Sequence, residues 1–230
     1  MTLSVLGYAF IGGLLPSLVW LYFLLKEDAR HPEPKVLIAL AFIAGMLAVP
    51  LALPLEQWAQ ANLSGQFPVF TAWALIEELL KYGVAAVLIF WRRAVDEAPD
   101  YVIYMITIAL GFAAAENALF LIAPLMDGNI ANSIFTGNVR FIGSSLLHVL
   151  ASAAIGFSLA FSSRSRPIIR AGAACAGLIL SVALHTAFNA LIINQGASAT
   201  LGAFFLVWTA AVVFFAAFEV LKYFQYRTLY

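Results

Sequence analysis

Charged residues are scarce in this 230-residue chain: Asp, Glu, Lys and Arg make up 10% of it, whereas 63% is hydrophobic. In a soluble domain about a quarter of the residues are usually charged. A chain with so few charges has too little polar surface to face water on all sides. The composition therefore indicates a membrane protein before any motif is considered.

An excess of one charge sign and a pair of cysteines are also missing. Acidic and basic residues are equal in number, so neither a nucleic-acid partner nor an acidic tail is expected. Cys175 is the one cysteine of the sequence, which excludes an intrachain disulfide. The first residues lack the basic segment of a cleaved signal peptide, so their apolar run is expected to remain as a membrane helix.

Long apolar runs, in contrast, are frequent. A spanning helix needs about 20 mostly apolar residues, and about seven stretches meet this requirement, separated by short connectors that contain Pro, Gly, Asn and Asp. They predict an all-α integral membrane protein: a bundle of about seven transmembrane helices that forms a single domain over residues 1–230. The predicted spans are Leu3–Leu25, Val36–Trp58, Val69–Trp91, Tyr101–Leu125, Val139–Phe161, Ala171–Ile193 and Thr200–Tyr223.

The basic residues outside the predicted spans fall on one side of this arrangement. Of the 12 Lys and Arg residues, all but Lys81 and Arg140 lie in the first, third and fifth connectors or near the C-terminus. Connectors rich in Lys and Arg usually stay in the cytoplasm. The distribution therefore predicts that the N-terminus lies outside and the C-terminus in the cytoplasm.

Ionisable side chains interrupt four of the predicted spans. They are Glu77, Glu78 and Lys81 in 69–91, Glu116 in 101–125, His148 in 139–161 and His185 in 171–193. A charged group at the bilayer centre costs about 2.5–3.5 kcal/mol on insertion scales, so such groups usually face one another or an internal water cavity. At about 1.5 Å of rise per residue, the acidic and histidine side chains lie about 12 to 14 Å from the outer ends of their helices. The four helices therefore present their polar residues in one layer.

The spacing within two helices supports a shared site. Lys81 follows Glu77 by four residues and Glu78 by three, so it shares a helix face with both carboxylates. His185 and Asn189 are four apart and share a face as well.

Four motifs occur in order, each inside its own apolar span: EELLK at 77–81, GFAAAEN at 111–117, His148, and HTAFN at 185–189. In this order they resemble the EExxK and FxxxE motifs, the lone histidine and the HxxxN/D motif of the PrsW family of intramembrane proteases. That family is placed in a wider group with CAAX/Abi-type prenyl-protein endopeptidases. The resemblance covers about residues 70–190.

The resemblance implies an intramembrane endopeptidase in the bacterial inner (cell) membrane. It would hydrolyse a peptide bond of a membrane-bound protein substrate within the lipid bilayer, and an anti-sigma factor is one candidate substrate. The residues implied in catalysis are Glu77, Glu78, Lys81, Glu116, Asn117, His148, His185 and Asn189, on the helices at about 69–91, 101–125, 139–161 and 171–193.

Glu77 is the expected general base, which takes a proton from the attacking water. Glu116, His148 and His185 are candidate ligands of Zn²⁺, because catalytic zinc sites combine three protein ligands with one open position. The HExxH spacing of zinc peptidases is absent, however. A metal-assisted and a metal-free glutamate mechanism therefore both stay open.

Two other functions are compatible with these residues. Buried carboxylates and histidines also form proton and ion pathways, although no internal repeat of the kind found in many transporters is visible. A catalytically inactive relative that acts as a membrane scaffold or binding protein would carry the same residues. Within the proposed site, Glu78 and Lys81 have the simpler interpretation of a structural ion pair.

Overall fold

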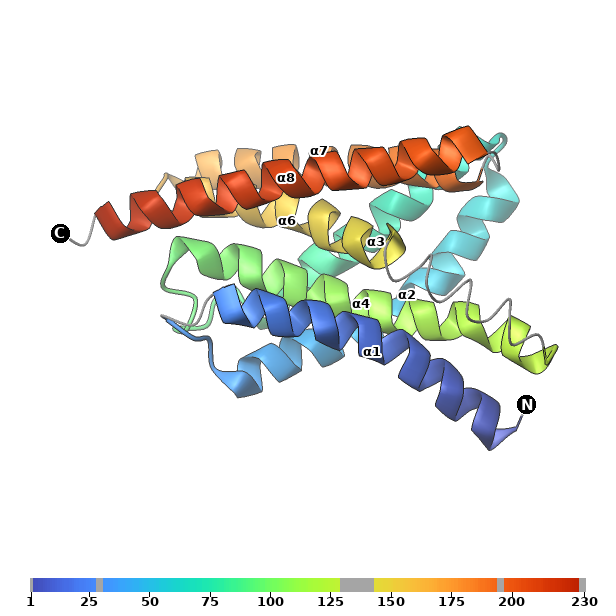
Figure 1. Ribbon diagram of the computed structural model, residues 1–230. Helices are drawn as coiled ribbons and strands as arrows, with labels where there is room; N and C mark the ends of the chain where they lie inside the picture. The colour runs from blue at the N-terminus through green and yellow to red at the C-terminus, as the bar shows by residue number, and fades with distance from the viewer. Residues whose placement is uncertain (1, 28–30, 129–142, 194–196, 228–230) are drawn as a thin grey trace.

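The computed structural model describes residues 2–27, 31–128, 143–193 and 197–227, and this part of the chain contains no strand. Figure 1 shows a bundle in which α4 and α6 run between α1 on one side and α7 and α8 on the other. The helices are α1 (Leu3–Glu27), α2 (Lys35–Asn62), α3 (Gln66–Leu88), α4 (Ala98–Met126), α6 (Ser145–Ser162), α7 (Pro167–Ile193) and α8 (Ala197–Arg227).

Helix α4 forms the centre of the bundle. Its residues 99–114 are all buried, and it packs against α1, α2 and α6. A helix that is apolar on every side is typically buried on every side. The chain enters α4 through a capping box, in which the Asp100 side chain accepts hydrogen bonds from the backbone N–H groups of Asp96 (2.9 Å) and Glu97 (2.7 Å).

Six of the described helices are long and apolar enough to cross a membrane, and α3 is the described helix that does not meet this criterion. The sequence predicted a span at 69–91, and a helix of similar bounds is present at Gln66–Leu88. It differs from a simple span because Glu77, Glu78 and Lys81 lie within it, and all three are buried. These charges therefore point into the protein rather than into lipid.

The other predicted spans agree with the helices to within a few residues, apart from the one at 139–161. There the described helix is Ser145–Ser162, and Arg140 lies outside the described residues. Two described basic residues, Arg170 of α7 and Lys222 of α8, lie close to the start of α4 and the end of α1. Arg170 Nη2 donates to the Tyr101 hydroxyl at 2.9 Å, and Lys222 Nζ lies 3.5 Å from a carboxylate oxygen of Glu27.

Two glycines bring α2 and α4 into backbone contact. A Cβ on Gly111 would lie 1.9 Å from the carbonyl oxygen of Phe42, and a Cβ on Gly45 would lie 2.1 Å from that of Ile108. Small residues at helix crossings allow such close approach in membrane proteins. The crossing positions α2 beside the polar residues that α3 and α4 carry.

Gly111→Ala is therefore expected to lower the free energy of unfolding by about 1–3 kcal/mol, because the added methyl meets backbone that cannot rotate away. The matched control is Gly83→Ala in α3, where an added Cβ meets nothing within 4 Å. There the better helix propensity of alanine is expected to stabilise the protein by up to about 1 kcal/mol. Unfolding by a denaturing detergent measures both changes, and equal stabilities of the two variants would contradict the close crossing.

Candidate active site

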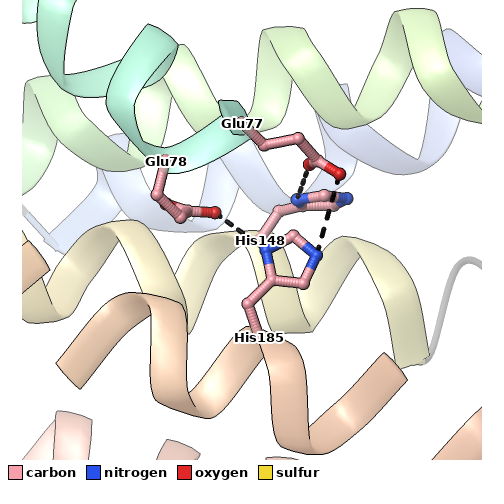
Figure 2. Close-up of side chains that lie close together, drawn as sticks. All are labelled: Glu77, Glu78, His148 and His185. Carbon is pink, nitrogen blue, oxygen red and sulfur yellow. Dashed lines mark hydrogen bonds and ion pairs between the residues drawn. The ribbon is translucent and has the colours of Figure 1, made fainter. Parts of the chain in front are cut away.

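Three helices direct ionisable side chains to one point inside the bundle. Helix α3 contributes Glu77, Glu78 and Lys81, α6 contributes His148, and α7 contributes His185. Figure 2 shows the two glutamates and the two histidines facing one another. All five side chains are buried, and Glu78 and Lys81 are completely so. The structure therefore brings together residues that the sequence predicted to lie in one layer.

Glu78 lies at the back of this cluster and has partners on both carboxylate oxygens. Its Oε1 accepts a hydrogen bond from Lys81 Nζ at 2.7 Å and lies 3.0 Å from His185 Nδ1. Its Oε2 accepts a hydrogen bond from the Ser152 hydroxyl at 3.0 Å. Because a carboxylate only accepts, His185 Nδ1 carries the hydrogen of their shared bond. Glu78 thus fixes the orientation of the His185 ring.

The Lys81 ammonium lies between three acceptors. Besides Glu78 it reaches Glu77 Oε2 at 3.2 Å and His148 Nδ1 at 2.9 Å. The Phe112 ring lies beneath it, with its centroid 4.3 Å from Nζ. An ammonium has three donors and no acceptor, so every donor of this buried group has a partner. Removing the lysine would leave two carboxylates without their cation.

The same contact sets the role of His148. Because Lys81 donates to Nδ1, a neutral His148 carries its hydrogen on Nε2 and donates it to Glu116 Oε2, 2.9 Å away. Through this bond α4 contributes Glu116 to the site. The Glu116 side chain is 22% exposed, in contrast to the enclosed Glu78.

Glu77 is the carboxylate that faces the opening of the cluster. Its Oε2 contacts Lys81 and lies 3.7 Å from His148 Nδ1, whereas its Oε1 lies 3.9 Å from His185 Nε2. A separation of 3.9 Å is too long for a hydrogen bond. Glu77 Oε1 and His185 Nε2 therefore do not bond to each other, and a small group on the cavity side could contact both atoms.

A cavity of about 350 Å³ lies in front of these atoms. A water molecule occupies about 30 Å³ in the liquid, so the cavity has room for water together with part of a substrate. Its lining separates the predicted site residues into two groups. Those that line it are Glu77, Glu116, His148, His185 and Asn189, whereas Glu78, Lys81 and Asn117 are not among its lining residues.

Asn117 has a structural contact. Its side-chain amide donates to the Ser145 hydroxyl at 3.0 Å, which joins α4 to α6. This bond lies one residue from Glu116, so it helps to position the neighbouring carboxylate.

Three further residues at the site were not among the predicted catalytic or metal-binding residues. Ser152 follows His148 by four residues, so the helical period alone would have placed it on the same face. Phe112 is the phenylalanine of the FxxxE-like motif, four residues before Glu116; the motif contained it but gave it no role, and the structure places its ring beneath Lys81. Glu56, near the end of the predicted span Val36–Trp58, lines the cavity from α2. Its position depends on the crossing of α2 and α4.

The donor atoms of the cluster are of the kind that binds zinc, which takes imidazole nitrogens and carboxylate oxygens. The three carboxyl groups of Glu77, Glu78 and Glu116 outnumber the one amine of Lys81, so the cluster is richer in acidic groups, as a site for a divalent cation requires. Residues whose ligand atoms lie within 4.8 Å of one another are Glu77, Glu78, His148 and His185.

This group differs from the zinc ligands that the sequence suggested. Glu116 contacts Nε2 of His148, the ring nitrogen away from the centre of the cluster, whereas Glu77 lies between the two histidines. Carboxylates that hold the second nitrogen of a metal-binding histidine are common around metal sites. Glu116 beside His148 and Glu78 beside His185 both have this arrangement.

Comparison with known proteins gives one family. The family model described as PrsW family intramembrane metalloprotease matches residues 33–218. Several curated relatives carry the name Protease PrsW. The one from Geobacillus kaustophilus is 27% identical over 148 residues, which cover 63% of this chain and 62% of the relative. The one from Oceanobacillus iheyensis is 31% identical over 130 residues, which cover 54% of this chain and 58% of the relative.

A third relative, from Bacillus subtilis, is 25% identical over 183 residues, which cover 78% of this chain and 80% of the relative. The matched part of this chain thus covers less than two thirds of the length of the first two relatives and 80% of the length of the third. No solved structure matches it.

Proposed function

Since this chain belongs to the PrsW family of intramembrane metalloproteases, we propose that it hydrolyses a peptide bond of a membrane-bound protein. The observation that supports this most is the position of Glu77. Its carboxylate faces a cavity together with His185 and Glu116, inside a bundle in which six of the described helices are long and apolar enough to span a membrane. A carboxylate and an imidazole that face the same space are suited to hold and deprotonate a water molecule.

In the proposed reaction a water molecule lies between Glu77 Oε1 and His185 Nε2. Glu77 takes one proton from the water while its oxygen forms a bond to the carbonyl carbon of the substrate. The C–N bond then breaks, and the protonated Glu77 returns the proton to the leaving amine. The Asn189 side-chain amide is the proposed donor to the negatively charged carbonyl oxygen; one such donor typically contributes about 2.7–4 kcal/mol.

Glu78 and Lys81 act in this proposal through their neighbours. Glu78 holds Nδ1 of His185 and thereby turns Nε2 toward Glu77. The Lys81 ammonium donates to Glu77 Oε2 at 3.2 Å and thereby holds that carboxylate in place at the cavity. Glu116 orients His148 in the same manner as Glu78 orients His185.

In the metal-assisted alternative, a zinc ion would be held by Glu77, His148 and His185, with Glu116 and Glu78 as the groups that orient the two rings; Glu77 would then be a ligand instead of the free base described above. When bound, it supplies a Lewis acid that polarises a water molecule or the substrate carbonyl. Lys81 competes for one of these ligands, because its ammonium already donates to His148 Nδ1.

The zinc assignment predicts that wild-type protein, dialysed against zinc and then washed, retains about one ion per chain, as catalytic sites do. His185→Ala is expected to lose the bound ion. The matched control is His31→Ala, whose ring is 51% exposed in the first connector. Elemental analysis measures the metal content, and equal zinc in all three proteins would show that the cluster does not bind it.

The membrane arrangement is part of the proposal. The end of the bundle that carries Arg170 and Lys222 lies in the cytoplasm, and the N-terminus lies outside. The host membrane is the bacterial inner membrane, and the substrate is a protein that crosses it once, such as an anti-sigma factor.

Proteolysis by the purified protein in lipid tests the activity directly. A labelled single-span protein is incubated with the wild type, with and without a strong chelator, and the products are identified by mass spectrometry. We expect one or a few defined cuts near one end of the span. Cuts that stop on chelation would support the metal-assisted mechanism, and cuts that continue would support the metal-free one. If the folded protein cuts no member of a broad set of single-span proteins, a scaffold or an ion-conducting function becomes the better interpretation, and ion flux is measured next.

A further inference from the structure

A second hollow lies beside the cavity of the active site, at the turn between α2 and α3. This groove of about 410 Å³ includes Gln60, Gly65, Gln66, Phe70 and Trp73 among its lining residues. The turn is made by Gly65 at a φ of 89°, a backbone conformation that residues with a side chain rarely adopt. The groove lies at the end of α3 away from the cytoplasmic end proposed above.

Trp73 separates this groove from the active-site cavity, since it lines both. Its indole N–H donates to the backbone carbonyl oxygen of Glu56 at 3.1 Å, and its ring packs against Phe70 with 5.8 Å between the ring centroids. Trp73 also lies one helical turn before Glu77. The Trp73 side chain, held in place by this hydrogen bond, therefore lies between the groove and the part of the cavity where the peptide bond is expected to react.

The groove offers free polar groups for a peptide backbone. The side-chain amides of Gln60 and Gln66 are exposed, and neither makes a hydrogen bond to another described residue. Each amide supplies two donors and an acceptor. An extended peptide needs such partners, because its backbone N–H and C=O groups are not paired within a helix.

Two other hollows of the described structure offer fewer polar groups. The groove between α3 and α7 is lined by apolar side chains and by Thr71 and Thr186; the Thr71 hydroxyl already donates to the carbonyl of Phe67, and the Thr186 hydroxyl is buried. The hollow between α1 and α8 is lined almost entirely by apolar side chains such as Phe214 and Leu110. Both suit lipid chains or helices better than an extended segment.

We propose that the α2–α3 groove binds the extended segment that flanks the substrate's membrane span on the side away from the cytoplasm. Gln60 and Gln66 pair with the backbone of this segment. Trp73 limits the size of the substrate side chain that enters the cavity next to the scissile bond. This inference rests on the proposed proteolysis, and it adds the part of the substrate that is recognised and the residue that sets side-chain specificity.

Disulfide trapping tests the groove without requiring activity. The background is Cys175→Ser, which removes the exposed native cysteine, with Glu77→Gln to prevent cleavage. Gln66→Cys is compared with Gln57→Cys, an exposed glutamine of α2 that does not line the groove. The probes are peptides with a span of about 20 apolar residues and one cysteine, moved along either flank.

We expect Gln66→Cys to crosslink to a few neighbouring positions of the non-cytoplasmic flank and Gln57→Cys to none of them. Equal crosslinking by the two variants, or trapping of the cytoplasmic flank, overturns the proposal. This result does not depend on whether the wild type is a protease.

Cleavage kinetics test the role of Trp73. Two peptides differ only in alanine or phenylalanine at the flank position that lies nearest the site in the trapping experiment. Trp73→Ala is expected to raise the ratio of kcat/KM for phenylalanine over alanine by about tenfold or more, because enlarging a pocket by a few carbon atoms has effects of this size. The control, Trp58→Ala, alters a tryptophan that is 63% exposed and outside both hollows.

An unchanged ratio in Trp73→Ala overturns the specificity role while leaving the proteolysis intact. If the wild type cuts neither peptide although trapping succeeds, the proposed proteolysis fails and the groove remains a binding site for the flank.

Discussion

Replacing Glu77 by glutamine is expected to lower kcat/KM for peptide-bond hydrolysis by about 10²–10⁴-fold, the usual contribution of a general base. The amide has nearly the same shape as the carboxylate, so it can keep the contact with Lys81, but it cannot take a proton from water. The measurement compares initial rates of cleavage for wild type and variant at equal concentrations of folded protein.

Two comparisons make this result specific. Glu219→Gln changes a carboxylate near the end of α8 that is 70% exposed, and it is expected to leave the rate unchanged. Glu78→Gln is expected to lower the rate as well, but through a misplaced His185 rather than through loss of the base. A Glu77→Gln variant with the rate of the wild type would falsify the assignment of the base.

Replacing Lys81 by methionine has the largest expected effect on stability. The ammonium is completely buried and contacts both Glu77 and Glu78. Removal of one partner from a buried ion pair typically destabilises a protein by about 3–5 kcal/mol, because the remaining charge stays buried without compensation. Unfolding in mixed micelles with increasing denaturing detergent measures the change.

The double variant Lys81→Met with Glu78→Gln is expected to recover part of the lost stability, because one uncompensated carboxylate becomes a neutral amide. Lys222→Met is the matched control. It removes an ammonium that pairs with Glu219 and Glu27 near the surface, where such pairs contribute about 0–1 kcal/mol. Equal losses for Lys81→Met and Lys222→Met would show that the α3 ion pairs do not hold the site together.

Much of the architecture was predictable because apolar length and helical period are local properties. The sequence places helices close to the observed ones for six of the seven described helices, and for the remaining one, Ser145–Ser162, it matches the C-terminal end. The same reasoning put Glu77, Glu116, His148 and His185 in one layer, because a fixed rise per residue converts position in a helix into depth.

What the sequence did not determine is which side of each helix meets the cavity. Glu77 and Glu78 are adjacent and chemically identical, yet one faces the cavity and the other is enclosed by Lys81, Ser152 and His185. A rotation of α3 about its own axis would exchange these roles. The rotation is fixed by packing against α2, α6 and α7, which involves residues far apart in the chain.

The sequence by itself thus determined that the chain forms apolar helices, that polar residues share one depth, and that its motifs are those of the PrsW family. The tertiary structure decided that Glu116 orients His148 and Asn117 binds Ser145, and that Glu56 and Trp73 wall the cavity. The physical reason is the distance along the chain over which each property is determined. Apolar length and helical period depend on neighbours along the chain, whereas contacts between helices depend on crossings such as that of Gly111 against Phe42, which no single segment encodes.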